Sequence, residues 1–397
     1  MMQLSKAAKA LMVFVCIAVV ALYSTNKRSS DDSGDLRGKE LERIVDTSSS
    51  TTTDEVQQSD DALMHFKNRA HPIPSKEWAK LDNHACIVNE EGDGRDLEKW
   101  QRRAPYVLIV GAMKAGTTAL NHYLAEHSSV ISGKRKEIHF YDFHFDKYAT
   151  EKGILRRSAR QAYADLYRRQ TIGLKVLQED DSKIALDDSP RYLFWSDRIP
   201  ARVLCVSPWV KILAVLRNPI DRAFSQYNMF LNAAGKSRPV GFTFKQWIEE
   251  DIQDMKNTGL LQDSIPLSEF SGSAEEMVAW KAYTRLGTHA PLGRGLYAIQ
   301  LRHWFKAFEE AGKSLDDIFI IQSELMKEKP ALVYADVLKF LGLDDEPLVD
   351  EEEENFPGNY HIKLNRHTRK KLEELYAPYN QELYDLLGDD WGGVWDP

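Results

Sequence analysis

The sequence has few cysteines and no excess of basic residues. These two features argue against two classes of protein, disulfide-rich scaffolds and general nucleic-acid-binding proteins. Its 397 residues include three cysteines, too few for a disulfide scaffold, and no CxxC or His/Cys cluster predicts a structural metal site. A Cys86–Cys205 pair and two separate buried thiols both remain open. The formal net charge of −8 supplies no overall basic field, which argues against a general nucleic-acid-binding protein.

Two short motifs are also absent. No N-x-[ST] sequon occurs, which leaves the cellular compartment undecided. A Walker-type phosphate loop needs a Gly-Lys pair followed at once by a hydroxyl residue that binds Mg²⁺. Residues 111–118 read GAMKAGTT, so the lysine comes before the second glycine. This order argues against a nucleotide-dependent kinase.

The same stretch nevertheless has the pattern of a phosphate-binding loop. Residues 107–110 are an unbroken apolar run, as in a strand buried on both faces of a parallel sheet. Glycines follow, and then apolar residues at helical spacing. A strand, a small-residue loop and a helix N-terminus direct backbone N–H groups at one anion site. Lys114, Thr117 and Thr118 add a charge and two hydroxyl donors. The alternative is an ordinary strand-to-helix turn with a surface lysine.

A second candidate phosphate site follows another apolar run, residues 210–216. The pattern R-x-P-x-x-R-x-x-S begins there, with Arg217 at the predicted carboxyl end of a strand, where α/β sheets bind ligands. Pro219 suits the first turn of a helix, and Ser225 lies two turns further on. A guanidinium pairs with a dianionic phosphate through two hydrogen bonds. A capped helix start is the alternative for this motif taken alone.

Between the two motifs, the segment KEIHFYD contains a candidate acid/base pair. If residues 137–141 are extended, Glu137, His139 and Tyr141 share one face. A carboxylate and an imidazole on one side, just after a phosphate loop, suit proton transfer. The alternative is a strand edge whose polar face meets water.

These segments, in this order, resemble sulfotransferases that use 3′-phosphoadenylyl sulfate (PAPS), in particular the Golgi heparan sulfate and other carbohydrate sulfotransferases. The resemblance extends from about Tyr106 to the C-terminus. It implies an α/β, P-loop-like three-layer fold with a central parallel sheet, PAPS as co-substrate and no metal. The residues that it assigns to PAPS are Lys114, Ala115, Gly116, Thr117 and Thr118, with Arg217 and Ser225 on the 3′-phosphate.

The resemblance also implies the catalytic and acceptor-binding residues. Glu137 would be the general base, Lys114 would stabilise the leaving phosphate oxygen, and His139 would orient the base or the acceptor. Asp142, Asp188 and Arg191 would bind the acceptor. Asp188 stands where the heparan-type enzymes have a lysine, and Arg191 is a candidate for the missing charge. No K-G-R-like nucleotide loop precedes the last predicted helix.

The implied acceptor is a carbohydrate, such as a glycosaminoglycan or another anionic polysaccharide, and not a nucleic acid. A lipid or tyrosine acceptor and an inactive glycan-binding protein remain alternatives. An inactive protein is expected to lose Lys114, Glu137, Arg217 or Ser225, yet all four are present.

The N-terminal part predicts a membrane protein with its catalytic domain in the Golgi lumen. We interpret residues 1–9 as a cytoplasmic tail, 10–23 as a single signal anchor of type II topology, 24–103 as a Ser/Thr-rich disordered stem and 104–397 as the catalytic domain. A cleaved signal peptide is the alternative for the anchor.

The remaining segments are predicted to form scaffold. Strands are predicted at 171–176 and 318–321, and helices at 152–169, 242–251, 331–341 and 368–387, together with one that starts near residue 295. The first of these helices is rich in basic residues, which predicts a solvated face or, as a minority interpretation, an acceptor groove. A loop is predicted at 258–273 and an acidic loop at 350–354.

Overall fold

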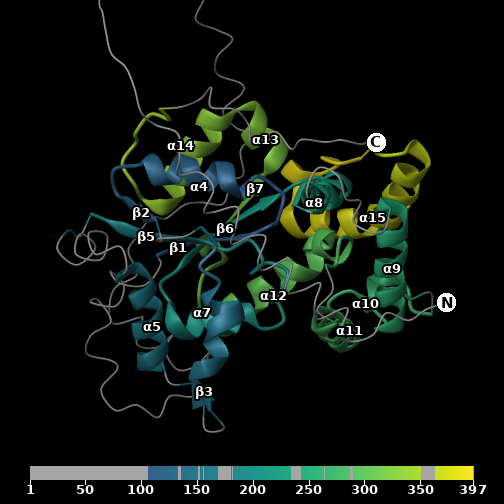
Figure 1. Cartoon of the computed structure of the whole chain (residues 1–397), viewed down its shortest axis with the longest axis horizontal. Helices are drawn as coiled ribbons and strands as arrows, with labels where there is room; N and C mark the ends of the chain where they lie inside the picture. The colour runs from purple at the N-terminus through teal and green to yellow at the C-terminus, as the bar shows by residue number, and fades with distance from the viewer. Residues whose placement is uncertain are drawn as a thin grey trace, which may run out of the picture. The chain divides into compact units, whose positions relative to one another are not determined.

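The computed structural model describes residues 106–132, 136–150, 153–154, 156–168, 180, 182–233, 243–262, 264–286, 289–349 and 363–396. Its fold is α/β, built on a five-stranded parallel sheet in the order β2-β5-β1-β6-β7 (Figure 1). The strands are β1 (Val107–Gly111), β2 (Val130–Ser132), β5 (Ile184–Asp188), β6 (Lys211–Leu216) and β7 (Ile318–Gln322). This confirms the predicted α/β fold with a central parallel sheet. A two-stranded hairpin of β3 (Ala149–Thr150) and β4 (Gly153–Ile154) lies outside the sheet.

The middle of the sheet explains why the candidate motifs meet. Every residue of β1 is buried, and β1 pairs in parallel with β5 on one side and β6 on the other. Apolar side chains on both faces suit this central position. Since parallel strands end at the same edge, the segments that follow β1, β5 and β6 come together at the point where the strand order reverses, the usual ligand site of such sheets.

Helices cover both faces of the sheet, as Figure 1 shows. One layer contains α4 (Thr117–Glu126), α13 (Ser323–Glu328) and α14 (Pro330–Leu341). The opposite layer contains α7 (Ile199–Val206) and α12 (Tyr297–Glu310), with α5 (Arg156–Arg168) packed against α7. The three layers share one hydrophobic core, and burial of its apolar surface is the main stabilising contribution to such a fold.

A second hydrophobic cluster lies beside the sheet and positions α8 (Pro219–Ala233), the helix that carries Ser225. Its other helices are α9 (Phe244–Asn257), α10 (Leu267–Phe270), α11 (Ala274–Arg285) and α15 (Arg366–Leu387). Buried Asp251 accepts hydrogen bonds from Tyr283 Oη at 2.6 Å and from the Leu292 amide at 2.7 Å. These bonds join α9 and α11 to the 3₁₀ turn η4 (Gly293–Gly295), which contacts α8.

Most predicted elements within the described ranges are confirmed. The runs at 107–110, 210–216 and 318–321 form β1, β6 and β7, and α4 follows the first run as expected. Helix α14 ends at Gly342, which has the left-handed φ of 70° that favours glycine. Pro378 lies inside α15. Helices also form at the other predicted positions, as α5, α9 and α12, but Gly153–Ile154 at the start of the first one pairs with β3 as strand β4. The predicted loop at 258–273 contains the short helix α10.

The expectation that residues 137–141 are extended is wrong. Glu137 and His139 have φ values of 64° and 55°, in the left-handed region. Residues Phe140–His144 then form a π-helical turn, η2. The Glu137 amide donates to the Asp188 carbonyl oxygen at 2.7 Å, and the His139 amide donates to Ser189 Oγ at 3.2 Å. These contacts with the end of β5 hold the backbone in a conformation that local sequence does not favour.

Several predictions fall partly or wholly outside the described residues. The cytoplasmic tail, the anchor, the stem, the strand at 171–176 and the acidic run at 350–354 lie there. Among the described helices, none is both long and apolar enough to cross a membrane. Cys205, buried in α7, is disulfide-bonded, and its partner is outside the described ranges. Arg160 in α5 belongs to no basic surface, because it is buried against Trp209 and donates to the Val206 carbonyl oxygen.

Candidate active site

The loop between β1 and α4 has the geometry of an anion site. Gly116 is the N-cap of α4, has φ 103°, and provides no side-chain cap to the helix amides. No acidic residue occupies the first turn, so the N-terminal amides and dipole favour an anion. A Cβ at Gly116 would lie 2.8 Å from Met326 Cε, which together with the positive φ explains the glycine. Thr117 is buried and Thr118 is exposed at the helix start, while Ala115 packs in the core.

The two candidate phosphate motifs contact each other directly. Arg217 follows β6, and its Nη1 donates to the Lys114 carbonyl oxygen at 3.3 Å, across 103 positions of sequence. Tyr297 Oη donates to the Arg217 carbonyl oxygen at 2.9 Å. Ser225 is buried in α8. The loop and Arg217 therefore lie together at the carboxyl edge of adjacent strands, as expected for segments that follow neighbouring parallel strands.

Arg222 is the central arginine of the R-x-P-x-x-R-x-x-S motif, and the sequence alone predicted no role for it. It is fully buried, and its Nη1 donates to the Met113 carbonyl oxygen at 3.4 Å and to Gln226 Oε1 at 2.9 Å. Its Nη2 donates to the Pro291 carbonyl oxygen. One guanidinium thus links the phosphate loop, α8 and the segment before η4. Only the central arginine of R-x-P-x-x-R-x-x-S signalled this role.

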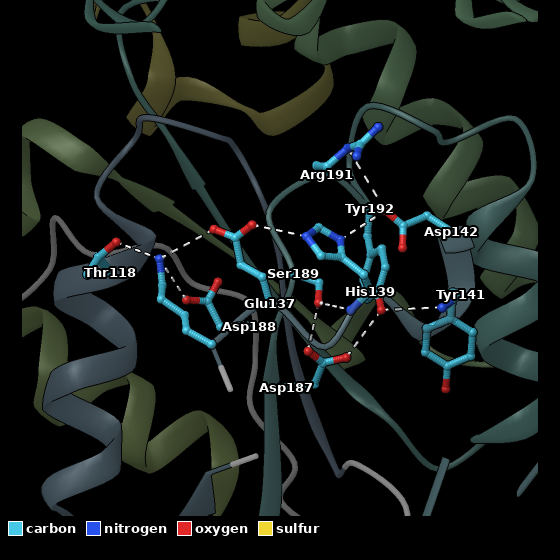
Figure 2. A network of polar contacts seen from close by, with 11 residues as sticks. Thr118, Glu137, His139, Tyr141, Asp142, Asp187, Asp188, Ser189, Arg191 and Tyr192 are labelled. Carbon is cyan, nitrogen blue, oxygen red and sulfur yellow. Dashed lines mark hydrogen bonds and ion pairs between the residues drawn. The ribbon is translucent and has the colours of Figure 1, made fainter. Parts of the chain in front are cut away.

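A hydrogen-bonded chain of Glu137, His139 and Asp142 forms the second part of the site (Figure 2). His139 Nε2 lies 3.1 Å from Glu137 Oε2, and His139 Nδ1 lies 3.0 Å from Asp142 Oδ2. Burial alone lowers the pKa of His139, but the hydrogen bonds and charges of the two carboxylates outweigh it and raise this pKa to about 9. At neutral pH the imidazolium therefore donates to both carboxylates.

The same contacts keep Glu137 ionised. Burial favours the neutral acid and raises the pKa of Glu137. The hydrogen bond from His139 and the charges of Lys136, His139 and Arg191 outweigh burial, so that this pKa is lowered below its ordinary value. Glu137 is thus a carboxylate through the whole neutral range, which is the state a general base needs.

Replacing His139 with asparagine is expected to shift the acid limb of the kcat–pH profile to higher pH. Without the imidazolium, only the charges of Lys136 and Arg191 oppose burial, so the pKa of Glu137 rises and its carboxylate becomes protonated at a higher pH than in the wild type. Sulfuryl transfer, the activity that the resemblance implies, checks this when it is measured from pH 4 to 9, with His367→Asn at an exposed position of α15 as control. An acid limb that stays in place in His139→Asn contradicts the assignment.

Lys136, to which the sequence assigned no role, connects Glu137 to the loop between β1 and α4. Its Nζ donates to Thr118 Oγ1 at 2.5 Å, and it lies 3.3 Å from Asp188 Oδ2 and 3.9 Å from Glu137 Oε1. Burial raises the pKa of Asp188 to about 8, against the opposing charge of Lys136. The aspartate that replaces the lysine of the resembling enzymes thus faces another lysine. The signal in the sequence was the position of Lys136, directly before Glu137.

A network of buried polar side chains around Asp187 supports the segment that contains Glu137 and His139. Asp187 accepts hydrogen bonds from Tyr163 Oη at 2.5 Å, Ser189 Oγ at 2.8 Å and Tyr192 Oη at 3.4 Å. Ser189 Oγ in turn accepts from the His139 amide, as Figure 2 shows. Fully satisfied buried networks fix a single geometry, and this one fixes the segment that carries Glu137.

The structure brings most of the predicted site residues together in two adjoining groups. Arg191 joins the second group, with its Nε 3.9 Å from Asp142 Oδ2. The first group comprises the loop from Lys114 to Thr118 with Arg217, and the second comprises Glu137, His139, Asp142, Asp188 and Arg191. Ser225 is buried in α8. The Lys136–Thr118 hydrogen bond joins the two groups.

Comparison with known proteins identifies the family of the chain. Residues 104–357 match the model of the sulfotransferase domain family, and this range contains both groups of site residues. The chain belongs to the sulfotransferase family.

Among individual sulfotransferases, heparan sulfate glucosamine 3-O-sulfotransferase 3A1 from Homo sapiens is 26% identical over 322 residues, which are 76% of this chain and 64% of that protein. The human 3B1 enzyme of the same description is 26% identical over 74% of this chain and 66% of its own length. The chain thus spans less than two thirds of these two relatives. A solved sulfotransferase structure from Alicyclobacillus acidocaldarius is 22% identical, with a TM-score of 0.44, over 71% of this chain and 95% of that one.

Proposed function

We propose that this sulfotransferase transfers the sulfuryl group of PAPS to a hydroxyl or amino group of a carbohydrate acceptor, a glycosaminoglycan or another polysaccharide. The observation that carries the proposal is the Lys136 bridge. One ammonium group lies within 2.5 Å of a hydroxyl at the start of α4 and 3.9 Å from the carboxylate of Glu137. A sulfuryl donor bound at the loop would therefore lie close to the carboxylate of Glu137, as transfer of an anionic group to a hydroxyl requires.

The donor half of the proposal rests on the loop and on α8. Lys114, Ala115, Gly116, Thr117 and Thr118 would hold the 5′-phosphosulfate, and Arg217 and Ser225 would hold the 3′-phosphate. An uncapped helix N-terminus and a nearby guanidinium, both at the edge of the sheet, suit two separate phosphate groups. The relatives named as heparan sulfate sulfotransferases support a carbohydrate acceptor.

In the proposed reaction, Glu137 removes the acceptor proton while the acceptor oxygen attacks sulfur. The bond between sulfur and the phosphate oxygen breaks in line, and 3′-phosphoadenosine 5′-phosphate leaves. Lys114 and the loop amides stabilise the charge on that phosphate oxygen, and Lys136 faces the transferred group. His139, held by Asp142, keeps Glu137 ionised and oriented. No step calls on a metal ion.

Binding of 3′-phosphoadenosine 5′-phosphate tests the donor half directly. Calorimetric titration of the protein is expected to show tight binding of this bisphosphate with or without Mg²⁺, and weak binding of ATP with Mg²⁺. Transfer of label from ³⁵S-PAPS to a panel of glycans, lipids and tyrosine peptides then identifies the acceptor class. A preference for ATP with Mg²⁺, or no binding of either nucleotide, contradicts the proposal.

We further propose that the protein is a single-pass type II protein of the Golgi membrane with its catalytic domain in the lumen. The support is the apolar segment 10–23 with flanking basic residues, followed by a Ser/Thr-rich stretch. In intact microsomes a C-terminal tag is expected to resist protease until detergent is added. Digestion without detergent contradicts this topology.

A further inference from the structure

The side chain of Arg191 is held between two aromatic rings beside the catalytic chain. Its Cζ atom lies 4.7 Å from the ring centroid of Phe143 and 4.4 Å from that of Trp195. The two rings are 6.1 Å apart and nearly perpendicular. Such contacts fix the plane of a guanidinium without using its N–H donors.

These donors have little to bind within the protein. Among the described residues, the Arg191 guanidinium makes no hydrogen bond, and its buried Nε lacks a partner. The nearest carboxylate oxygen, Asp142 Oδ2, is 3.9 Å from Nε and already accepts from His139 at 3.0 Å. The side chain is 27% exposed, so a ligand has access to it. An arginine has five N–H donors, and leaving buried donors unpaired is costly.

Phe143 connects this guanidinium to the base. Its ring is 4.9 Å from the ring of His139, which contacts Glu137. Phe143 is nevertheless 43% exposed, one of the few large apolar side chains of the described residues that are so exposed. The C–H face of a sugar ring is apolar, and aromatic side chains with a few fixed polar groups typically line ligand sites. Phe143 is thus placed to pack against a sugar next to the reacting hydroxyl.

Charges of both signs lie around Arg191, because the carboxylates of Asp142 and Glu137 favour its charged form and its own charge acts on Arg294. Burial, followed by the charges of Arg191 and Arg222, lowers the pKa of buried Arg294 to about 9. On the other side of the base, by contrast, Lys136 is paired with Asp188 at 3.3 Å. Among the described residues around Glu137, Arg191 is thus a cation with unused donors, and an anionic group bound there would pair directly with its guanidinium.

We infer that Arg191, held between Phe143 and Trp195, forms an acceptor subsite for a carboxylate or sulfate group on a saccharide whose ring packs against Phe143. This inference rests on the proposed function and deepens it, because it specifies an acidic sugar at or beside the modified residue. Asp142 serves both parts, since the same carboxylate orients His139 and lies next to Arg191, as Figure 2 shows.

Arg191→Gln tests the subsite in the full-length protein. The probes are a heparan sulfate oligosaccharide and the same oligosaccharide after carboxyl reduction and desulfation. We expect Arg191→Gln to raise the KM for the acidic probe by about 10–100-fold, as for loss of charge-assisted hydrogen bonds, with kcat within about threefold. Arg191→Lys is expected to keep part of the affinity. The neutral probe is expected to be a poor substrate whose KM does not respond to Arg191→Gln.

Arg198→Gln is the matched control. The Cζ atom of Arg198 also lies over Trp195, 5.2 Å from the ring centroid, but the Arg198 guanidinium forms an ion pair with Asp197. We expect this variant to keep the wild-type KM for the acidic probe. Direct binding of the acidic probe, followed by calorimetry, gives the same comparison without turnover, and wild-type binding is expected to weaken with salt.

Three results would overturn the inference. They are an equal rise in KM for the acidic and neutral probes, no binding of the acidic probe to the wild-type protein, and the same loss in Arg198→Gln as in Arg191→Gln. Failure of the proposed function is seen separately, as absence of 3′-phosphoadenosine 5′-phosphate binding in the wild type. Arg191→Gln is expected to leave that binding unchanged within twofold.

Discussion

Glu137→Gln is expected to lower kcat by about 10²–10⁴-fold, the range typical of losing a general base, while binding of 3′-phosphoadenosine 5′-phosphate stays near wild type. The amide has almost the shape of the carboxylate and can still accept a hydrogen bond from His139 Nε2, which lies 3.1 Å from Glu137 Oε2. It cannot take up the acceptor proton. The change therefore removes the proposed proton transfer and leaves the phosphate loop intact.

The measurement pairs ³⁵S transfer from PAPS with calorimetry of the bisphosphate on the same preparations. Glu346→Gln provides the control, since Glu346 also accepts hydrogen bonds, from the Ser128 amide and hydroxyl, but far from the carboxyl edge of the sheet. It is expected to retain wild-type turnover. Turnover of Glu137→Gln within about threefold of wild type would remove Glu137 from the mechanism, and joint loss of turnover and bisphosphate binding would indicate a structural role instead.

The loss of kcat is expected because the electrostatic contacts of Glu137 keep its carboxylate in the form that accepts a proton. His139 is a cation between Glu137 and Asp142, so the proton of the imidazolium is held by two carboxylates. A buried charge persists only when it is paired and hydrogen-bonded. Within the group of Glu137, His139 and Asp142 the imidazolium contacts both carboxylates, and the lowered pKa of Glu137 keeps its carboxylate ionised at neutral pH.

Sequence alone predicts the parts of the site whose conformation is local. The apolar runs of β1 and β6 and the glycine and proline at the starts of α4 and α8 fix where Lys114 and Arg217 lie relative to the sheet. Because parallel strands end at one edge, two motifs about a hundred residues apart are expected to meet there. The hydrogen bond between Arg217 and the Lys114 carbonyl oxygen shows that the two segments are in contact.

The parts that sequence does not predict depend on tertiary contacts. Two non-glycine residues with positive φ, Glu137 and His139, contradict the extended conformation that alternation favours. Their backbone amides donate to the last residue of β5 and to the residue that follows it, about fifty positions away, and no local pattern encodes such partners. The contact of Lys136 with Thr118 and Asp188 is equally non-local, which explains why the sequence assigned no role to this lysine.

Arg160 is a residue for which the sequence pattern predicts a solvated charge and the structure shows a buried one. A basic residue on an amphipathic helix is usually solvated, yet Arg160 packs on Trp209 and donates to the Val206 carbonyl oxygen. A guanidinium suits this place because its flat apolar faces pack while its edge donates. Composition predicts a charged face, and only the neighbouring helix α7 determines that this arginine is buried.

Arg217→Ala is expected to weaken binding of 3′-phosphoadenosine 5′-phosphate by about 10–100-fold, as for loss of hydrogen bonds to a charged group. The change removes the proposed 3′-phosphate donor and also the bond from Nη1 to the Lys114 carbonyl oxygen. Binding of adenosine 5′-phosphate, which lacks the 3′-phosphate, is expected to fall by less than about fivefold. Arg217→Lys keeps a charge but loses the paired geometry, and its affinity is expected to lie between those of Arg217→Ala and the wild type.

The comparison of the two nucleotides separates recognition of the 3′-phosphate from support of the loop. If Arg217 only holds Lys114 in place, both nucleotides lose affinity equally in Arg217→Ala, and the 3′-phosphate assignment is wrong. If Arg217 binds the 3′-phosphate, the loss is confined to the bisphosphate. Arg285→Ala, which removes an exposed arginine from the end of α11, should change neither affinity. Calorimetry of the four proteins with both nucleotides therefore decides which contact of Arg217 matters, because the loop contact is common to both nucleotides and the phosphate contact is not.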